Sequence, residues 1–171
     1  MRRLAGMVAG MALMAGGGAA GAQVASDKPL TTLSVAEVRA LGVETGGAPG
    51  EVEHLDNNEY RLQIVYPDGP PVYFEGWSCT GEGEAKRCAE FEMHVWFEFD
   101  SEAEAQAKEH EIGVVWLSDM AIGSDLKVWR MDYLAGMTRG RMRGVFETFL
   151  DTVDVARDVA FPAKEGATGG K

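Results

Sequence analysis

The sequence predicts an α+β domain with one antiparallel five-stranded sheet, in the order α-β-β-β-α-β-β-α, and with the helices packed on one face of the sheet. Three observations support this fold class. Residues 91–99, FEMHVWFEF, place apolar side chains at every second position, which is the period of a strand. Two Ser-x-x-Glu segments, at residues 34–37 and 101–104, are typical of helix starts. Residues 138–156 space their apolar side chains three and four positions apart, as a helix with one buried face does.

The first 22 residues have the pattern of a secretory signal peptide. Two arginines precede an apolar run over residues 4–15, and the Ala-Gly-Ala of residues 20–22 offers the small side chains that a signal peptidase needs. The apolar run is shorter than the roughly 20 residues of a membrane-spanning helix. We therefore expect cleavage near Ala22, a flexible leader over residues 23–32, and a periplasmic or secreted protein that does not insert into a membrane.

The chain is strongly acidic, and its length after cleavage suits one domain. It holds 16 Lys and Arg against 27 Asp and Glu, a net charge of −11, and loss of the two arginines in the signal peptide brings this to −13. Phosphate backbones and anionic membrane surfaces repel such a chain. We expect no nucleic-acid partner, one folded domain over residues 33–161, and a disordered tail over residues 162–171.

The first half of the domain is predicted to hold one short helix and three strands. Ser34 and Glu37 form a capping box for a helix that ends at Gly42. Residues 43–58 show no clear period and hold at most one weak strand. Three strands forming a meander are expected over residues 60–66, 72–77 and 91–99. The turn between the first two is marked by the segment PDGPP.

The second half is predicted to hold two helices and two strands. A capping box at Ser101 opens a helix to about Glu111, and its mostly alanine apolar face places it on the surface. Strands over residues 114–118 and 125–134 are joined by a turn near Gly123.

The last helix is expected to begin at Thr138 and to face the core. Gly140 and Gly144 weaken it by about 1 kcal/mol each relative to alanine. The side chains expected on its buried face are Met142, Val145, Phe146, Phe149, Val153 and Ala156.

The chain has two cysteines, Cys79 and Cys88, and we expect them to form a disulfide. Cysteine pairs of exported proteins are usually oxidised. A structural zinc site needs four ligands with shorter cysteine spacing, and a thioredoxin-like site needs Cys-x-x-Cys. A catalytic or sensing thiol pair and a metal site remain the alternatives. Closing a loop of about ten residues stabilises a fold by roughly 2–3 kcal/mol.

Three segments resemble one known family. They are YFEGWSC (73–79), CAEFEMHVWFEFD (88–100) and MDYLAGMT (131–138). Together they resemble the YbjN family, whose fold is similar to that of type III secretion chaperones, over roughly residues 34–160. The last segment is similar to the family's aspartate-bearing strand, which leads through a glycine turn into the final helix. The central helix departs from the family pattern, because this chain reads EAQAKEHEI at residues 104–112, where the family often has Asn, Trp and an Arg-Phe pair.

The resemblance implies a non-enzymatic domain, a regulator of sensory transduction or a protein-binding module, and it implies no catalytic residues and no cofactor. The sequence itself is consistent with a non-enzymatic domain, because the chain has no G-x-S-x-G segment and no phosphate-binding glycine loop leading from a strand into a helix. The alternative is a small periplasmic metal-binding protein or metal-dependent enzyme that uses His94 with Glu92 or Glu98. These three side chains share one face of a predicted strand, but their ligand count is incomplete. We therefore expect no bound metal.

The face of the sheet opposite the helices is the predicted binding surface. By strand alternation Trp96 and His94 lie there, and Tyr73 and Trp77 join them from the neighbouring strand. We also expect Glu75 on this face, with Arg130 and Asp132 from the last strand. Aromatic side chains rimmed by charge suit a protein partner or self-association as a homodimer.

Overall fold

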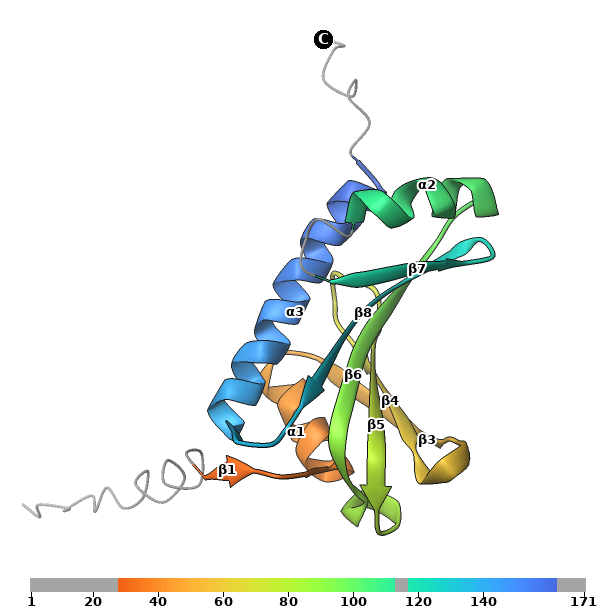
Figure 1. Cartoon of the computed structure of the whole chain (residues 1–171). Helices are drawn as coiled ribbons and strands as arrows, with labels where there is room; N and C mark the ends of the chain where they lie inside the picture. Colours follow the sequence, from red (N-terminus) through yellow and green to blue (C-terminus); the bar gives the residue numbers. More distant parts are fainter. Residues whose placement is uncertain (1–27, 113–116, 163–171) are drawn as a thin grey trace, which may run out of the picture.

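The computed structural model describes residues 28–112 and 117–162 (Figure 1). The predicted signal peptide and most of the tail lie outside the described residues, as do residues 23–27 of the leader and residues 114–116 of the strand predicted over 114–118.

Twelve helices and strands, together with two short 3₁₀ turns, make up the described part of the chain. The strands are β1 (Pro29–Leu30), β2 (Leu33–Ser34), β3 (Ala48–His54), β4 (Tyr60–Val65), β5 (Val72–Thr80), β6 (Arg87–Glu98), β7 (Ser118–Ile122), β8 (Asp125–Tyr133) and β9 (Met137–Thr138). The helices are α1 (Val35–Glu44), α2 (Glu102–Ile112) and α3 (Arg139–Ala160). The 3₁₀ turns are Asp56–Asn58 and Gly83–Ala85.

The fold is α+β, but the predicted five-stranded sheet is wrong. The main sheet has seven strands in the order β3-β4-β5-β6-β8-β7, with β2 paired to β6 beside that path. All of its pairs are antiparallel. A separate two-stranded sheet joins β1 to β9, so that Pro29 lies opposite Thr138. The N-terminal part of the domain is therefore paired to a segment near its C-terminal helix.

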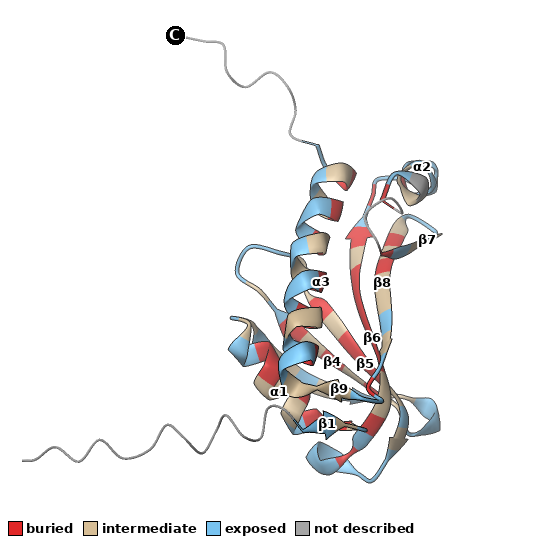
Figure 2. Cartoon of the chain, turned by 60° about the vertical axis from the view of Figure 1, so that its left-hand side comes forward, coloured by how far each residue is buried: buried red, intermediate tan, exposed pale blue. Residues whose placement is uncertain are grey.

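The helices are not all packed on one face of the sheet, which is a second correction to the predicted fold. Helix α3 runs along one face of the sheet, and α1 lies on that side near the N-terminal end of α3 (Figures 1 and 2). Helix α2 follows the end of β6 and packs against β7, β8 and α3 at the edge of the molecule. The predicted surface position of α2 is confirmed, because most of its side chains are exposed.

The predicted helix starts are confirmed in detail. The Ser34 side chain accepts from the backbone N–H of Glu37, and the Glu37 carboxylate accepts from the N–H of Ser34, which completes the capping box of α1. The N–H of Glu104 donates to Ser101 Oγ at 3.3 Å ahead of α2. Thr138 is the N-cap of α3 and accepts from the N–H of Arg141. Each cap satisfies a backbone donor that the helix itself cannot pair.

The core lies between α3, α1 and the face of the sheet that they cover (Figure 2). The alternating apolar residues of β6 project into it, and the aromatic rings of Phe74 and Phe146 meet there at 5.5 Å. The buried residues of α3 are Met142, Phe146, Phe149, Val153, Ala156 and Ala160. The apolar residues that the sequence spaces three and four positions apart therefore form the face of α3 that contacts the core.

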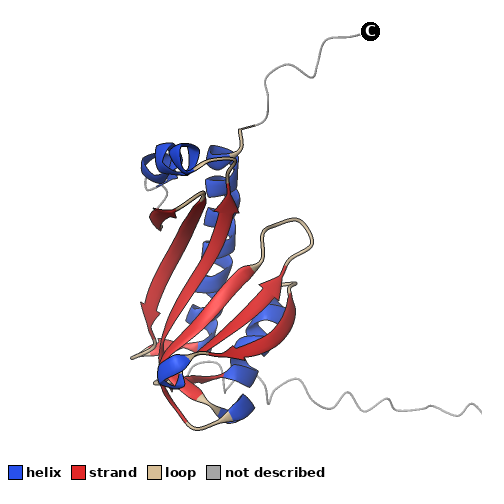
Figure 3. Cartoon of the chain, turned by 90° about the vertical axis from the view of Figure 1, so that its right-hand side faces the viewer, coloured by secondary structure: helices blue, strands red, loops and turns tan. Residues whose placement is uncertain are grey.

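The opposite face of the sheet has no described helix over it (Figure 3). We call it the open face. Because successive side chains of a strand point to opposite sides, the polar positions of β6 are directed to this face. The strand register then brings side chains from β4, β5 and β8 beside them.

Candidate functional site

The register of four strands defines the centre of the open face. His94 on β6 lies opposite Tyr73 on β5 and Trp129 on β8. In the next row, Glu92 lies opposite Glu75 and Met131. Further open-face side chains, placed by the same register, are Arg61, Gln63, Trp77, Glu90, Trp96 and Lys127.

A cluster of ionisable groups occupies this centre, and we call it the polar cluster: Glu75, Glu92 and His94. One ligand-type atom from each side chain lies within 4.8 Å of the others. Two cations flank the cluster. Lys127 Nζ is 2.5 Å from Glu92 Oε1, and Arg61 Nη2 is 2.5 Å from Glu75 Oε1. The two carboxylates of the cluster therefore each face a positive charge.

The polar cluster is buried although no described helix covers it. His94 is 1% exposed, Glu75 5% and Glu92 6%. Aromatic rings provide the cover: the Tyr73 ring stacks on the imidazole of His94 at 5.2 Å, and Trp96 meets it edge-on at 6.0 Å. The open face thus has a polar layer at the sheet and half-buried rings around it.

The imidazole of His94 is paired at one nitrogen only. Nδ1 lies 3.0 Å from Glu92 Oε1, the oxygen that also pairs with Lys127 Nζ at 2.5 Å. Nε2 is buried and has no hydrogen-bond partner among the described residues. Burial without a partner costs a polar group about 1–3 kcal/mol. The Nε2 of His94 therefore carries this cost in an otherwise paired cluster.

The charge on Glu92 is retained in spite of its burial. Burial alone raises the pKa of this carboxyl, but the neighbouring His94 and Lys127 outweigh it and hold the pKa below its usual range. Glu92 is therefore a carboxylate at neutral pH.

The predicted binding residues lie on the open face, but not all of them are brought together. Tyr73 and Trp96 both contact His94, as expected for one surface patch. Trp77 is half-buried two positions after Glu75, and its Nε1 is buried without a hydrogen bond among the described residues. His94 itself is covered, so its neighbours and not its own ring form the surface.

Two predictions about this face are wrong, and a third candidate residue lies apart from the polar cluster. Arg130 and Asp132 do not lie on it, because their strand partners are Met93 and Phe91, whose side chains are in the core. Glu98 is exposed and is not part of the polar cluster.

Lys127 and Trp129 contribute to the face and were not predicted. The alternation of buried Leu126 and Val128 along β8 is the signal that places them there. Lys127 Nζ lies 5.7 Å above the centre of the Trp129 ring and 6.0 Å above that of Trp96.

The expected disulfide between Cys79 and Cys88 is confirmed. The two residues lie directly opposite each other on β5 and β6, with their Cα atoms 4.0 Å apart. The bond closes the hairpin end next to Gly76, where an added Cβ would lie 2.7 Å from Cys88 Sγ. In the described residues the cysteines are therefore structural and hold no metal-ligand geometry.

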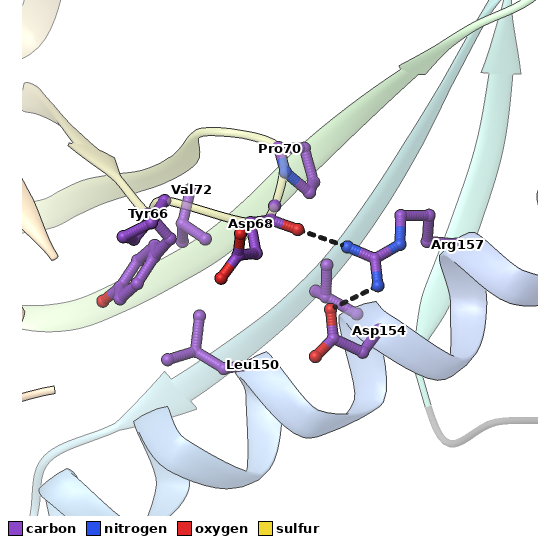
Figure 4. A pocket seen from close by; sticks show the side chains of 10 residues that line it. Tyr66, Asp68, Pro70, Val72, Leu150, Asp154 and Arg157 are labelled. Carbon is purple, nitrogen blue, oxygen red and sulfur yellow. Dashed lines mark hydrogen bonds and ion pairs between the residues drawn. The ribbon is translucent and has the colours of Figure 1, made fainter. Parts of the chain in front are cut away.

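A separate pocket lies on the helix side of the sheet, away from the polar cluster (Figure 4). It has a volume of about 260 Å³ and lies between α3 and the turn that joins β4 to β5. Arg157 closes one side, because it donates to the carbonyl of Asp68 at 2.7 Å and pairs with Asp154 at 3.2 Å. Both acceptors of Arg157 belong to the pocket wall, so its guanidinium is already paired within that wall.

Within the described residues, no helix is both long and apolar enough to cross a bilayer. Comparisons of the chain with protein-family models, curated proteins and solved structures give no match. The resemblance to the YbjN family therefore stays a prediction.

Proposed function

We propose that this chain is a non-enzymatic, exported binding module that holds a cationic segment of a protein partner on the open face. The observation that supports the proposal most directly is the set of half-buried rings on a sheet face without a described helix, formed by Tyr73, Trp96 and Trp129. Large aromatic side chains that remain accessible on one face are typical of contact surfaces. The disulfide supports export.

The rings already have the geometry that attracts a cation. The ammonium of Lys127 lies about 6 Å above two tryptophan rings, and the guanidinium of Arg61 lies 6.0 Å above Tyr73. Aromatic faces attract ammonium and guanidinium groups at such distances, by about 0.5–2 kcal/mol for each contact. A lysine or arginine of a partner can use the outer faces of the same rings.

The charge of the chain favours the same class of partner. The net charge is −11, and Glu53 and Glu98 are exposed carboxylates on or beside the open face. A negative surface accelerates association with a positive partner and repels an acidic one. A second copy of this acidic chain is for that reason a poorer partner than a basic segment.

Tryptophan fluorescence tests the proposal with the full chain and two ten-residue peptides, one of alternating lysine and valine and one of alternating glutamate and valine. We expect saturable binding of the lysine peptide and none of the glutamate peptide. Trp96→Ala should weaken binding about tenfold, which is 1.4 kcal/mol, with little change in melting temperature. Val155→Ala, an exposed apolar position on α3, is the matched control and should bind like the natural chain.

Two outcomes contradict the proposal. Equal binding of both peptides would show that charge does not select the partner. A concentration-dependent dimer that Trp96→Ala dissociates, measured by sedimentation, would identify a second copy as the occupant of the open face.

A further inference from the structure

We propose that the polar cluster of Glu75, Glu92 and His94 is a binding site for a divalent cation of the zinc class. This inference goes beyond the proposed partner binding, because it concerns the buried layer beneath the aromatic rings. It starts from two independent observations, the convergence of three ligand side chains and the buried, unpaired Nε2 of the imidazole among them.

The three side chains supply the kinds of ligand atom that zinc binds. Zinc binds histidine nitrogen and glutamate oxygen at about 2.0–2.2 Å, and sites with three protein ligands keep a fourth position open. Ligand atoms around one tetrahedral ion are then about 3.4 Å apart. The ligand atoms of the cluster lie within 4.8 Å of one another, so they need to draw together by about 1 Å. Glutamate side chains can move that far by rotation about their own bonds.

The burial of His94 is the observation that points to a ligand. Its side chain is 1% exposed, and its Nε2 has no hydrogen-bond partner in the described residues. Native proteins pair nearly all buried polar side-chain atoms, so an unpaired imidazole nitrogen in a cluster with two carboxylates needs an explanation. A metal ion bonded to Nε2 would remove that cost.

The two cations beside the cluster can give way to a metal ion. Arg61 already contacts a second carboxylate, Glu53, at 3.3 Å, and Glu53 is 60% exposed, so Arg61 can pair there when Glu75 turns to the metal. Lys127 is a single flexible ammonium whose other contacts are the rings of Trp96 and Trp129. In this arrangement Lys127 is a competitor that the metal displaces from Glu92.

The chemistry of the ligands selects the class of ion. One imidazole with two carboxylates suits zinc and its neighbours in the first transition row. Calcium prefers six to eight oxygen ligands, and magnesium requires near-octahedral oxygen coordination, which three side chains with one nitrogen do not provide.

Isothermal titration of the untagged, chelator-treated full chain with Zn²⁺ tests the site, with Ca²⁺ and Mg²⁺ titrated in parallel. We expect one Zn²⁺ for each chain, no binding of Ca²⁺ or Mg²⁺, and a higher melting temperature with Zn²⁺ present. Co²⁺ bound in place of Zn²⁺ should give the visible absorption of a four-coordinate site.

Three variants separate this site from adventitious binding. His94→Gln should lower the Zn²⁺ affinity at least 100-fold, whereas His54→Gln, which changes an exposed histidine at the end of β3, should leave it unchanged. Lys127→Met should raise the affinity about tenfold, because the competing ammonium is gone. This gain of affinity remains informative if His94→Gln does not fold.

Absence of Zn²⁺ binding to the full chain would overturn the site, as would equal affinities of the natural chain and a folded His94→Gln. A loss of binding in His54→Gln would place the ion elsewhere. Failure of the metal site leaves the peptide titration of the open face unaffected, so the two proposals fail separately.

Discussion

Tyr60 carries a hydroxyl group that is fully buried and has no hydrogen-bond partner among the described residues. Tyr60→Phe removes that group without changing the packing of the ring, so the free energy of unfolding should stay the same or rise by up to about 1 kcal/mol. Tyr66→Phe is the matched control. Its hydroxyl lies 2.8 Å from Thr45 Oγ1, and its loss should cost about 1 kcal/mol in urea unfolding.

The same hydroxyl makes stability depend on alkaline pH. Burial, with the nearby charges of Glu84 and Glu37, raises the pKa of Tyr60 above its usual value of 10.0. Above pH 10 the unfolded chain loses this proton while the folded chain keeps it, so the free energy of unfolding falls by up to about 1.4 kcal/mol for each pH unit. Tyr60→Phe should remove this part of the decline. An identical decline in both proteins would contradict the assignment.

His94 shows how far single residues can be predicted. Alternation along β6 placed it correctly on the polar side of the strand. Its burial could not be predicted, because the rings that cover it come partly from β5 and act across the sheet register. Glu75 lies in the polar cluster because the same register brings it opposite Glu92, whereas Glu98, at the end of β6, lies outside the cluster.

At the scale of single elements, strand β8 was predicted with nearly correct ends but with the wrong side outward. The segment contains Leu126 and Val128 in the core, so its odd-numbered residues face the open side. The charges of Arg130 and Asp132 suggested the opposite reading. They are tolerated on the helix side because they pair with each other at 2.6 Å near the strand end. A charge at a strand end is therefore weaker evidence of orientation than the buried aliphatic residues before it.

Two glycines in different elements should respond oppositely to alanine. At Gly76 in β5 an added Cβ would lie 2.4 Å from the ring of Tyr60, so Gly76→Ala should lower the free energy of unfolding by about 1–3 kcal/mol. At Gly144 in α3 nothing lies within 4 Å, so Gly144→Ala should raise it by about 1 kcal/mol. Urea unfolding measures both. A stabilising Gly76→Ala would contradict the close packing at that position.

The β5–β6 hairpin depends on its disulfide. Cys79 and Cys88 are separated by nine positions, and constraining a loop of that size in the unfolded chain contributes roughly 2–3 kcal/mol. Reductant should therefore lower the stability of the natural chain by about this amount. The double variant Cys79→Ala with Cys88→Ala should start lower and be insensitive to reductant. Complete reduction, shown by thiol labelling, without loss of stability would contradict the prediction.

At the scale of the whole molecule, the α+β class could be predicted, but the number of strands in the sheet could not. Strand β3 is exposed on most of its length and its register shifts between Pro49 and Val52, so it shows no alternation. Strands β1, β2 and β9 are two residues each, too short for any period to be visible. Their pairing is decided by distant partners, which local patterns do not report.

The predicted export can be tested on the whole chain. Expressed with residues 1–22 in a Gram-negative host, the protein should be recovered from the periplasm with Gln23 as its first residue, and its cysteines should not react before reduction. A chain that begins after residue 22 should remain in the cytoplasm with reactive thiols. Recovery of the full chain from the cytoplasm with Met1 retained would contradict this proposal.

The pairing of β1 with β9 sets the order of events during synthesis. Pro29 emerges from the ribosome early, but its partner Thr138 emerges only when most of the chain has been made. Leu33 must likewise wait for Cys88 on β6. Contacts between such distant segments form slowly, because a long loop has to close before they contribute. The N-terminal segment therefore cannot take its place in the fold until β9 has been made.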